Sequence, residues 1–217
     1  MDPVNHLRTY DVAELERIAH EQLSKLGSGF SIPLDVDYII EQLPGVDLEY
    51  YPALRNNYGL DGMVGLDLDT GETIIYIDET LATSESLPRR YRMTVAEELA
   101  HLVLHRKAIE SVRESTDFQG LHKLGNWYDY ERNAKRLAAM ILMPSEYILK
   151  HSRDLYHKIV SQVGFDNVEI VKKFSATELA DHYEVSLQTM KNRLAEWPIK
   201  VIEKIDEAMQ NRLDFLD

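Results

Sequence analysis

Hydrophobic residues recur three or four positions apart along five stretches of the chain, a spacing that places them on one face of an α-helix. The predicted helices span residues 11–26, 35–43, 93–104, 127–143 and 198–210. Asp11 and Glu14 resemble a capping box at the start of the first helix, and Pro144 ends the fourth. Ser145 is placed to cap a further helix, so the chain beyond Pro144 is expected to be helical.

Three shorter stretches predict β-strands, because apolar residues alternate along them or form short runs. They are residues 46–50, 62–67 and 73–78. Gly71 lies between the second and the third and suits the positive φ of a hairpin loop. Residues 74–77 are apolar on both faces, which predicts a strand covered on both sides. The sheet therefore comes directly before the helix at residues 93–104.

Two stretches in the second half of the chain depart from simple periodicity. Residues 110–126 are polar and aperiodic, which predicts a mobile loop or short turns. Residues 177–194 resemble a helix-turn-helix with the turn at Val185 and Ser186. Residues 175–196 contain four acidic and only two basic side chains, which favours a structural helix pair over a DNA-binding one.

Composition narrows the chemistry that the chain can carry. It has 217 residues, 44% hydrophobic and 28% charged, as is usual for soluble globular proteins. No apolar run reaches the roughly 18 residues of a membrane span, and no signal-like segment opens the chain, so a cytoplasmic protein is expected. The absence of cysteine excludes disulfides and thiolate ligands, so a metal must use His, Asp or Glu. The net charge of −13 argues against non-specific binding to nucleic acid.

The helix predicted over residues 93–104, with Ser86 or Pro88 suited to open it, carries Glu97, Glu98 and His101 within an otherwise apolar run. Glu97 and His101 lie one turn apart on one face, and Glu98 points about 100° away. The layout is that of H-E-x-x-H, in which two histidines bind zinc and the glutamate is the general base. Glu97 stands where that motif has its first histidine.

The helix predicted over residues 127–143 supplies a further candidate. Glu131 falls inside its apolar stripe, and a carboxylate on a buried face needs a partner. If the two helices pack side by side, Glu97, His101 and Glu131 can converge on one metal ion. A single ion would then satisfy three otherwise costly groups.

Each of these residues also has a plainer interpretation. Thr94 and Glu97 have capping-box spacing, so Glu97 could simply mark the start of a helix. The basic cluster Arg89, Arg90 and Arg92 could pair with Glu97 or Glu98. His101 alone is more often a satisfied core or surface histidine than a ligand, and Glu131 alone more often a solvated charge.

Three further possibilities concern the same region. His105, one turn after His101, is expected to pack or cap rather than bind a metal. His122, in the polar stretch, could approach the site as an oxyanion stabiliser. Glu98 and His101 also form the E-x-x-H unit of di-iron bundles, but the second helix has Ala134 where a histidine is required, so a mononuclear site ranks higher.

Two segments together resemble a known family. Residues 91–105, YRMTVAEELAHLVLH, and residues 131–144, ERNAKRLAAMILMP, are similar to the ImmA/IrrE family of metallopeptidases. The corresponding family patterns are roughly R-F-T-x-A-H-E-x-x-H-x-x-x-H and E-x-x-x-N-x-F-A-x-x-L-L-M-P. Residues 185–194 also match the family pattern V-S-x-x-x-x-x-x-R-L. The resemblance covers about residues 35–197.

The resemblance implies an α+β, zincin-like fold in which a small sheet borders the active-site helix. It makes Glu97, His101 and Glu131 the metal ligands and Glu98 the general base. Residues 1–144 would then hold the first helices, the sheet and the metallopeptidase-like core, and residues 145–217 a helical region of the same globule. The implied substrate is a helix-turn-helix transcriptional repressor, cleaved under stress or during induction of a mobile element.

The chain departs from the family pattern at Glu97, at Lys135 where Asn is usual and at Leu137 where Phe is usual. We interpret the last two as changes in packing. Two glutamates and one histidine around Zn²⁺ sum to zero charge, so the bound water should be less acidic than in a site with two histidines. The oxygen-rich set also makes Mn²⁺ or Fe²⁺ acceptable beside Zn²⁺.

The leading hypothesis is a metal-dependent endopeptidase whose substrate strand lies along the sheet edge near residues 62–78. One alternative is a catalytically weak or inactive member that binds a regulator protein through the substrate cleft. A second is a DNA-binding regulator that uses residues 177–194. The expected partner is a protein, with no direct contact to nucleic acid or a membrane.

Overall fold

The structure is a computed structural model of the chain. It describes residues 8–27, 30–67, 70–111, 127–162 and 167–211. The chain divides into two compact units. One consists of Met1–Ser31 and Asp35–Ile141, and the other of Ile32–Leu34 and Leu142–Asp217. Among the described residues, no helix combines the length and the apolar character needed to cross a membrane.

A three-stranded sheet in the order β1-β3-β2 forms the base of the first unit. β3 (Thr73–Asp78) pairs antiparallel with β2 (Gly62–Leu66) and parallel with β1 (Val46–Tyr51). The predicted pairing of the second and third strands is confirmed, and Gly71 has the expected positive φ of 76°. β3 is the central strand and is almost entirely buried, as its apolar character predicts. β2 is left as an edge strand.

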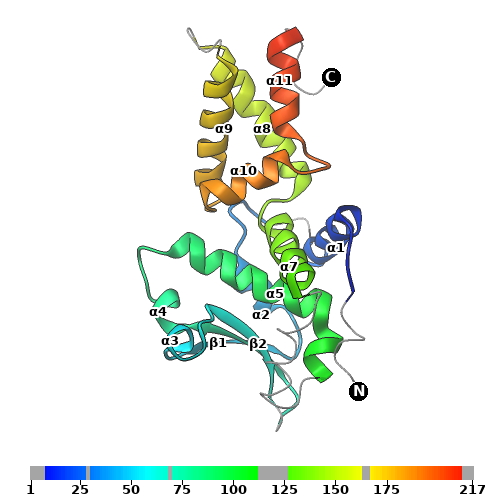
Figure 1. Ribbon diagram of the computed structural model, residues 1–217, viewed down its shortest axis with the longest axis vertical. Helices are drawn as coiled ribbons and strands as arrows, with labels where there is room; N and C mark the ends of the chain where they lie inside the picture. The colour runs from blue at the N-terminus through cyan, green and yellow to red at the C-terminus, as the bar shows by residue number, and fades with distance from the viewer. Residues whose placement is uncertain (1–7, 28–29, 68–69, 112–126, 163–166, 212–217) are drawn as a thin grey trace. The chain divides into compact units, whose positions relative to one another are not determined.

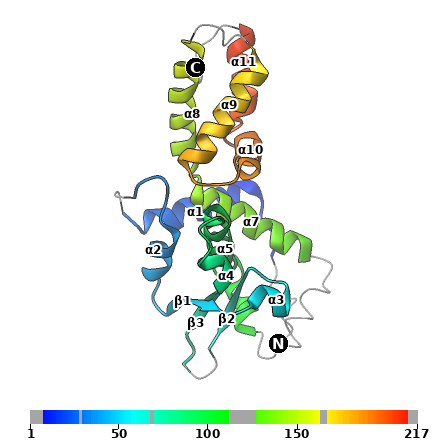
Figure 2. The same ribbon diagram turned by 90° about the vertical axis from the view of Figure 1, so that its left-hand side faces the viewer.

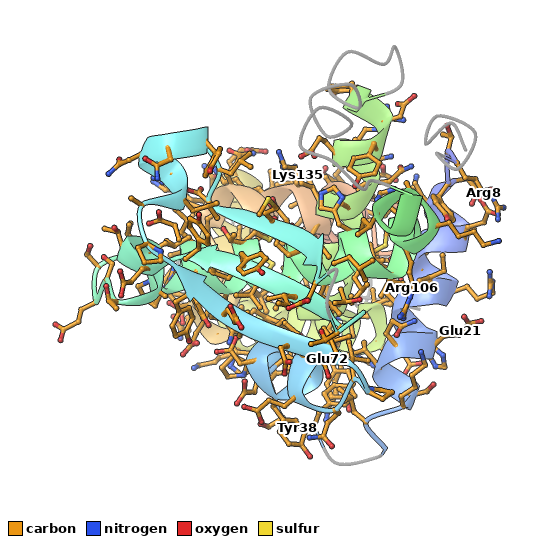
Figure 3. The ribbon with its side chains drawn as sticks, turned by 90° about the horizontal axis from the view of Figure 1, so that it is seen from below. Arg8, Glu21, Tyr38, Glu72, Arg106 and Lys135 are labelled. Atoms are coloured by element: carbon orange, nitrogen blue, oxygen red, sulfur yellow. The ribbon has the colours of Figure 1, made fainter. Side chains whose placement is uncertain are left out.

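Helix α5 (Pro88–Ser111) lies across one face of this sheet and contacts β2 and β3 (Figure 1). The view in Figure 3 shows α2 on the β1 side of the sheet and α7 on the β2 side. The bounds of the remaining helices of this unit are α1 Val12–Ser24, α2 Val36–Glu41, α3 Leu54–Tyr58, α4 Glu79–Ala82 and α7 Trp127–Leu142. The α+β class predicted from the sequence is confirmed.

Most helix boundaries follow the local signals. The capping box of Asp11 and Glu14 is present at α1, and Asp35 caps α2. Pro88 begins α5, as one of the two suggested openings. The prediction of a loop from residue 110 is wrong for its first two residues, which belong to α5, and residues 112–126 lie outside the described part of the chain. The backbone of α5 leaves helical geometry at His105, with φ −123° and ψ 16°.

The second unit contains four helices that pack together (Figure 2). They are α8 Ser145–Val160, α9 Val168–His182, α10 Leu187–Ala195 and α11 Val201–Asn211. α9 and α10 form the predicted helix-turn-helix pair, and the Ser186 hydroxyl accepts a hydrogen bond from the Thr189 backbone N–H at 3.0 Å, which caps α10.

Ser145 does not cap α8, so that prediction is wrong. The capping position is held by Pro144, and Ser145 is already the first helical residue. Its hydroxyl instead accepts a hydrogen bond from the Arg193 guanidinium at 2.9 Å, and the Arg193 Nε donates to the Met143 carbonyl at 3.2 Å. The fully buried Arg193 thereby ties α10 to the start of α8.

Asp78, at the end of β3, links that strand to two short helices. Its carboxylate accepts hydrogen bonds from the backbone N–H groups of Arg55 at 2.9 Å and Leu81 at 3.2 Å. Asp78 is buried, and the hydrogen bond from Arg55, supported by that from Leu81, holds its pKa below the usual value. The carboxylate thus anchors α3 and α4 against the central strand.

The Asp78→Asn variant is expected to lose about 1–2 kcal/mol of stability at neutral pH, because a neutral amide accepts these hydrogen bonds less strongly. A carboxyl whose pKa is lower in the folded than in the unfolded protein stabilises the fold above the unfolded value, 3.8, and ceases to do so as the pH falls through the folded value. The difference between wild type and variant should therefore shrink below about pH 4. Urea denaturation from pH 7 to pH 2.5 measures it, and a constant difference would contradict the assignment.

Candidate active site

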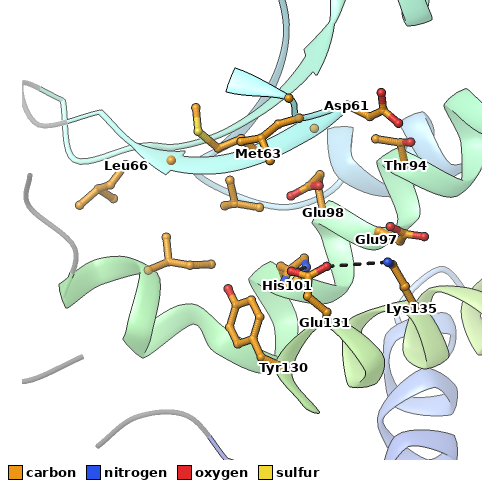
Figure 4. Close-up of a pocket in the computed structure, with 16 residues that line it drawn as sticks. Asp61, Met63, Leu66, Thr94, Glu97, Glu98, His101, Tyr130, Glu131 and Lys135 are labelled. Atoms are coloured by element: carbon orange, nitrogen blue, oxygen red, sulfur yellow. Dashed lines mark ion pairs between the residues drawn. The ribbon is translucent and has the colours of Figure 1, made fainter. Parts of the chain in front are cut away.

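A cavity of about 370 Å³ lies in the first unit between the edge strand β2, helix α5 and helix α7. Figure 4 shows its lining side chains. All four residues proposed from the sequence, Glu97, Glu98, His101 and Glu131, line this cavity. The two helices that carry them are separated by residues 112–126 in the chain, so the fold has gathered them from two segments.

His101 and Glu131 bring two potential ligands together across the two helices. His101 Nε2 lies 3.5 Å from Glu131 Oε1. Two donor atoms each about 2.1 Å from a tetrahedral ion stand roughly 3.4 Å apart, so this separation is that of two ligands of one ion. An imidazole nitrogen and a carboxylate oxygen are also the donor types that a divalent metal takes in the absence of cysteine. The pair therefore fits a metal in both separation and chemistry.

Glu97 lines the same cavity but does not complete a three-residue cluster. Within the described part of the chain, no group of three or more His, Asp or Glu side chains is arranged to hold a metal ion. The capping interpretation of Glu97 is wrong, because α5 begins at Pro88 and both Thr94 and Glu97 lie inside the helix. Burial, with the nearby charges of Glu131 and Asp61, raises the pKa of Glu97 to about 7, although Lys135 opposes the rise.

Lys135 is a residue of the site that the sequence interpretation missed. Its Nζ lies 3.9 Å from Glu131 Oε2, and its side chain lines the cavity (Figure 4). The interpretation of this position as a change in packing is therefore wrong. The available signal was the spacing, because Lys135 follows Glu131 by four residues and so shares its helix face.

Glu98 lies half-buried under the edge strand. A Cβ atom added to Gly62 of β2 would lie 2.8 Å from both Cγ and Oε1 of Glu98, so only a glycine lets the strand pass this close. Burial first, and then the negative charges of Glu97 and Glu131, raise the pKa of Glu98 well above its usual value. Glu98 is thus a carboxyl in a low-dielectric position beside the strand.

His105 packs against His101 and Tyr130, so the prediction that it packs is confirmed. The Nδ1 atoms of the two rings lie 3.2 Å apart, and His105 stacks on Tyr130 with ring centroids 3.8 Å apart. Burial lowers the pKa of each histidine to about 3, so both rings are neutral at pH 7. When His101 Nδ1 donates to His105, its Nε2 faces Glu131 without a proton, the form that binds a metal.

The other residues that the sequence suggested for this region have different surroundings. Arg90 Nε donates a hydrogen bond to Asp61 Oδ2 at 3.0 Å, so Arg90 pairs with the residue before β2 and not with Glu97 or Glu98. Ala134 is fully buried and offers no ligand for a second iron. His122 lies outside the described residues.

The comparison with protein families places this site within a known domain. The family model described as the IrrE N-terminal-like domain, Peptidase M78, matches residues 59–195, which is more than half of the chain. The match begins just before β2 and runs through α10, so it includes the whole candidate site. Among curated proteins, none matches the chain.

Proposed function

We propose, from the membership of the chain in the IrrE N-terminal-like family, Peptidase M78, that it is a metal-dependent endopeptidase. The observation that carries the proposal is the 3.5 Å separation of His101 Nε2 and Glu131 Oε1, beside the carboxyl of Glu98. A pair of converging ligands with a further carboxyl beside it provides the groups that metal-assisted hydrolysis uses, a metal site and a general base.

His101, Glu131 and Glu97 would hold the metal. When bound, a divalent ion would polarise the scissile carbonyl and make a water molecule more acidic. Zn²⁺ is the expected ion, and Mn²⁺ or Fe²⁺ are acceptable because two of the three ligands are carboxylates. Glu97 is the proposed third ligand because it lies one helical turn before His101 and lines the same cavity.

Glu98 would act as the general base and then as the general acid. Its carboxylate takes a proton from water as the oxygen attacks the peptide carbonyl carbon, and passes that proton to the amine nitrogen as the C–N bond breaks. The hydrolysis consumes one water and needs no other reactant. The close approach of Gly62 on β2 limits the positions that the Glu98 carboxyl can take.

The substrate would bind as an extended strand along β2. Within the described residues, β2 pairs with β3 alone, so its other edge offers backbone groups to a peptide. The cavity opens beside this edge, and Gly62 to Leu66 form part of its wall. We infer from the family that the substrate is a regulatory protein of the helix-turn-helix repressor type in the cytoplasm.

The proposal is tested by calorimetric titration of Zn²⁺ and Mn²⁺ into metal-stripped protein. Wild type is expected to bind one ion, and His101→Ala to bind it at least about 100-fold more weakly, because a ligand is lost from a site with few donors. His20→Ala, which removes an exposed histidine from α1, is the matched control and should bind as wild type does. Equal affinity of the His101→Ala variant and wild type would overturn the proposal.

A catalytically weak member that binds a regulator protein through the same cavity is the second candidate. It is favoured by the lack of a three-residue ligand cluster among the described residues and by the ammonium of Lys135 beside Glu131. Incubation of the metal-loaded protein with a helix-turn-helix repressor separates the two. Fragments detected by mass spectrometry support the peptidase, whereas metal-dependent binding without fragments supports the binding protein.

A further inference from the structure

We propose that Lys135 is an internal counter-cation of the site, which holds the carboxylates of Glu131 and Glu97 and which a metal ion must displace in order to bind. Lys135 would thereby set the metal concentration at which the protein becomes loaded. This inference rests on the proposed function, because it concerns the same ligands. It implies that the protein has a stable form without metal, in which Lys135 supplies the positive charge, and a metal-bound form.

The position of the ammonium supports this role. Lys135 Nζ lies 3.9 Å from Glu131 Oε2, while the other oxygen of Glu131 faces His101 Nε2 at 3.5 Å. Figure 4 marks the ion pair between Lys135 and Glu131 and shows Glu97 among the side chains that line the same pocket. The charge of the ammonium acts on both carboxyl groups, because it opposes the rise in pKa that burial causes in each of them.

The charges around the cavity favour a cation. The cavity is lined by four carboxyl groups, of which Asp61 is already paired with Arg90 and the other three are those of Glu97, Glu98 and Glu131. Among the described residues that line it, Lys135 is the only one with a permanent positive charge. Carboxylates gathered in a half-buried space repel one another unless a cation or a proton neutralises them. Lys135 therefore provides, without metal, part of the charge that a divalent ion would bring.

The same ammonium opposes a metal ion. A divalent cation bound to Glu131 would stand within a few ångströms of Nζ, and two like charges at such a distance repel each other. Displacement is nevertheless simple, since the Lys135 side chain is 57% exposed and can rotate into solvent without movement of α7. The cost of releasing Glu131 and Glu97 from the ammonium lowers the affinity for metal.

The ammonium thus favours the charged form of two of the proposed ligands, Glu97 and Glu131, and lies 3.9 Å from an oxygen of Glu131. When Lys135 leaves, both carboxylates become available to the ion at once. An asparagine, the usual family residue at this position, has no charge with which to impose this competition.

The experiment compares metal affinity in four proteins by calorimetric titration of Zn²⁺ and of Mn²⁺. They are wild type, Lys135→Met, Lys135→Arg and Lys107→Met. Lys135→Met removes the charge and keeps the length of the side chain, and its Kd is expected to fall about tenfold. Lys135→Arg keeps the charge and should bind as wild type does. Lys107→Met makes the same change at an exposed lysine of α5 that does not line the cavity, and should leave the Kd unchanged.

Thermal unfolding without metal gives a second, independent measure. Lys135→Met should unfold at a lower temperature than wild type in the absence of metal, and should gain more than wild type when metal is added. A Kd of Lys135→Met equal to that of wild type, with one ion bound by both, overturns the inference and leaves the proposed function standing. Absence of metal binding in every one of the four proteins overturns the proposed function, and the inference with it.

Discussion

The Glu98→Gln variant is expected to cleave its substrate about 10³-fold more slowly than wild type, because a glutamine cannot accept and return the proton. Metal affinity should change by less than about threefold, since Glu98 points away from the ligand face of α5 and the amide keeps the volume of the carboxyl. Single-turnover cleavage and calorimetric titration measure the two quantities on the same preparations. The combination of lost turnover and retained metal is the result that identifies a general base.

Two comparisons give this prediction its control. Glu85→Gln makes the same substitution at an exposed glutamate before α5 and should leave turnover unchanged. Glu98→Asp shortens the side chain but keeps the acid, so partial activity is expected from it. If Glu98→Gln retains more than about a tenth of the wild-type rate, Glu98 is not the base and another group must accept the proton.

The Gly62→Ala variant is expected to lose about 100-fold in kcat/KM and about 1–3 kcal/mol of stability. The added Cβ would lie 2.8 Å from Cγ and Oε1 of Glu98 and 2.9 Å from Cγ2 of Thr94. These distances are too short for carbon and oxygen atoms in contact, so β2 must move away from α5 or Glu98 must leave its place. Either movement misaligns the substrate strand and the base, and a misplacement of about 1 Å costs roughly two orders of magnitude in rate.

Gly65→Ala, in the same strand, is the matched control. Its Cβ would meet Tyr76 Cε2 at 3.2 Å, a ring that is only partly buried and able to shift. It should therefore retain activity within severalfold of wild type and lose less stability than Gly62→Ala. Urea denaturation and the cleavage assay together make the comparison, and identical behaviour of the two alanine variants would refute a special role for Gly62.

Local signals in the sequence were sufficient for much of the fold. The strands β2 and β3 and the helices α1 and α7 follow from periodicity, caps and breakers, which act between residues a few positions apart. The helices α3 and α4 were not predicted, because five and four residues are too few to establish a helical period. Both depend on Asp78, whose carboxylate binds backbone groups from either helix.

The parallel pairing of β1 with β3 illustrates a second limit. It joins residues more than 25 positions apart, such as Val46 and Thr73, and no short-range pattern specifies such a partner. Ser145 illustrates a third, because a serine before a helical stretch is a sound capping signal. A guanidinium from α10, 48 residues away, instead takes its hydroxyl as an acceptor.

The sequence by itself determined which chemical groups the site would contain. Glu97, Glu98 and His101 follow from spacing within one helix, and Glu131 from its place on an apolar stripe, since both arguments need only the helical period. The tertiary structure alone decided how these groups meet. It sets the distance of 3.5 Å between His101 Nε2 and Glu131 Oε1, places Gly62 of β2 directly against the Glu98 side chain, and brings Lys135 Nζ next to the Glu131 carboxylate. Contacts between distant segments depend on how whole elements pack, and packing is a property of the folded chain rather than of any short stretch of it.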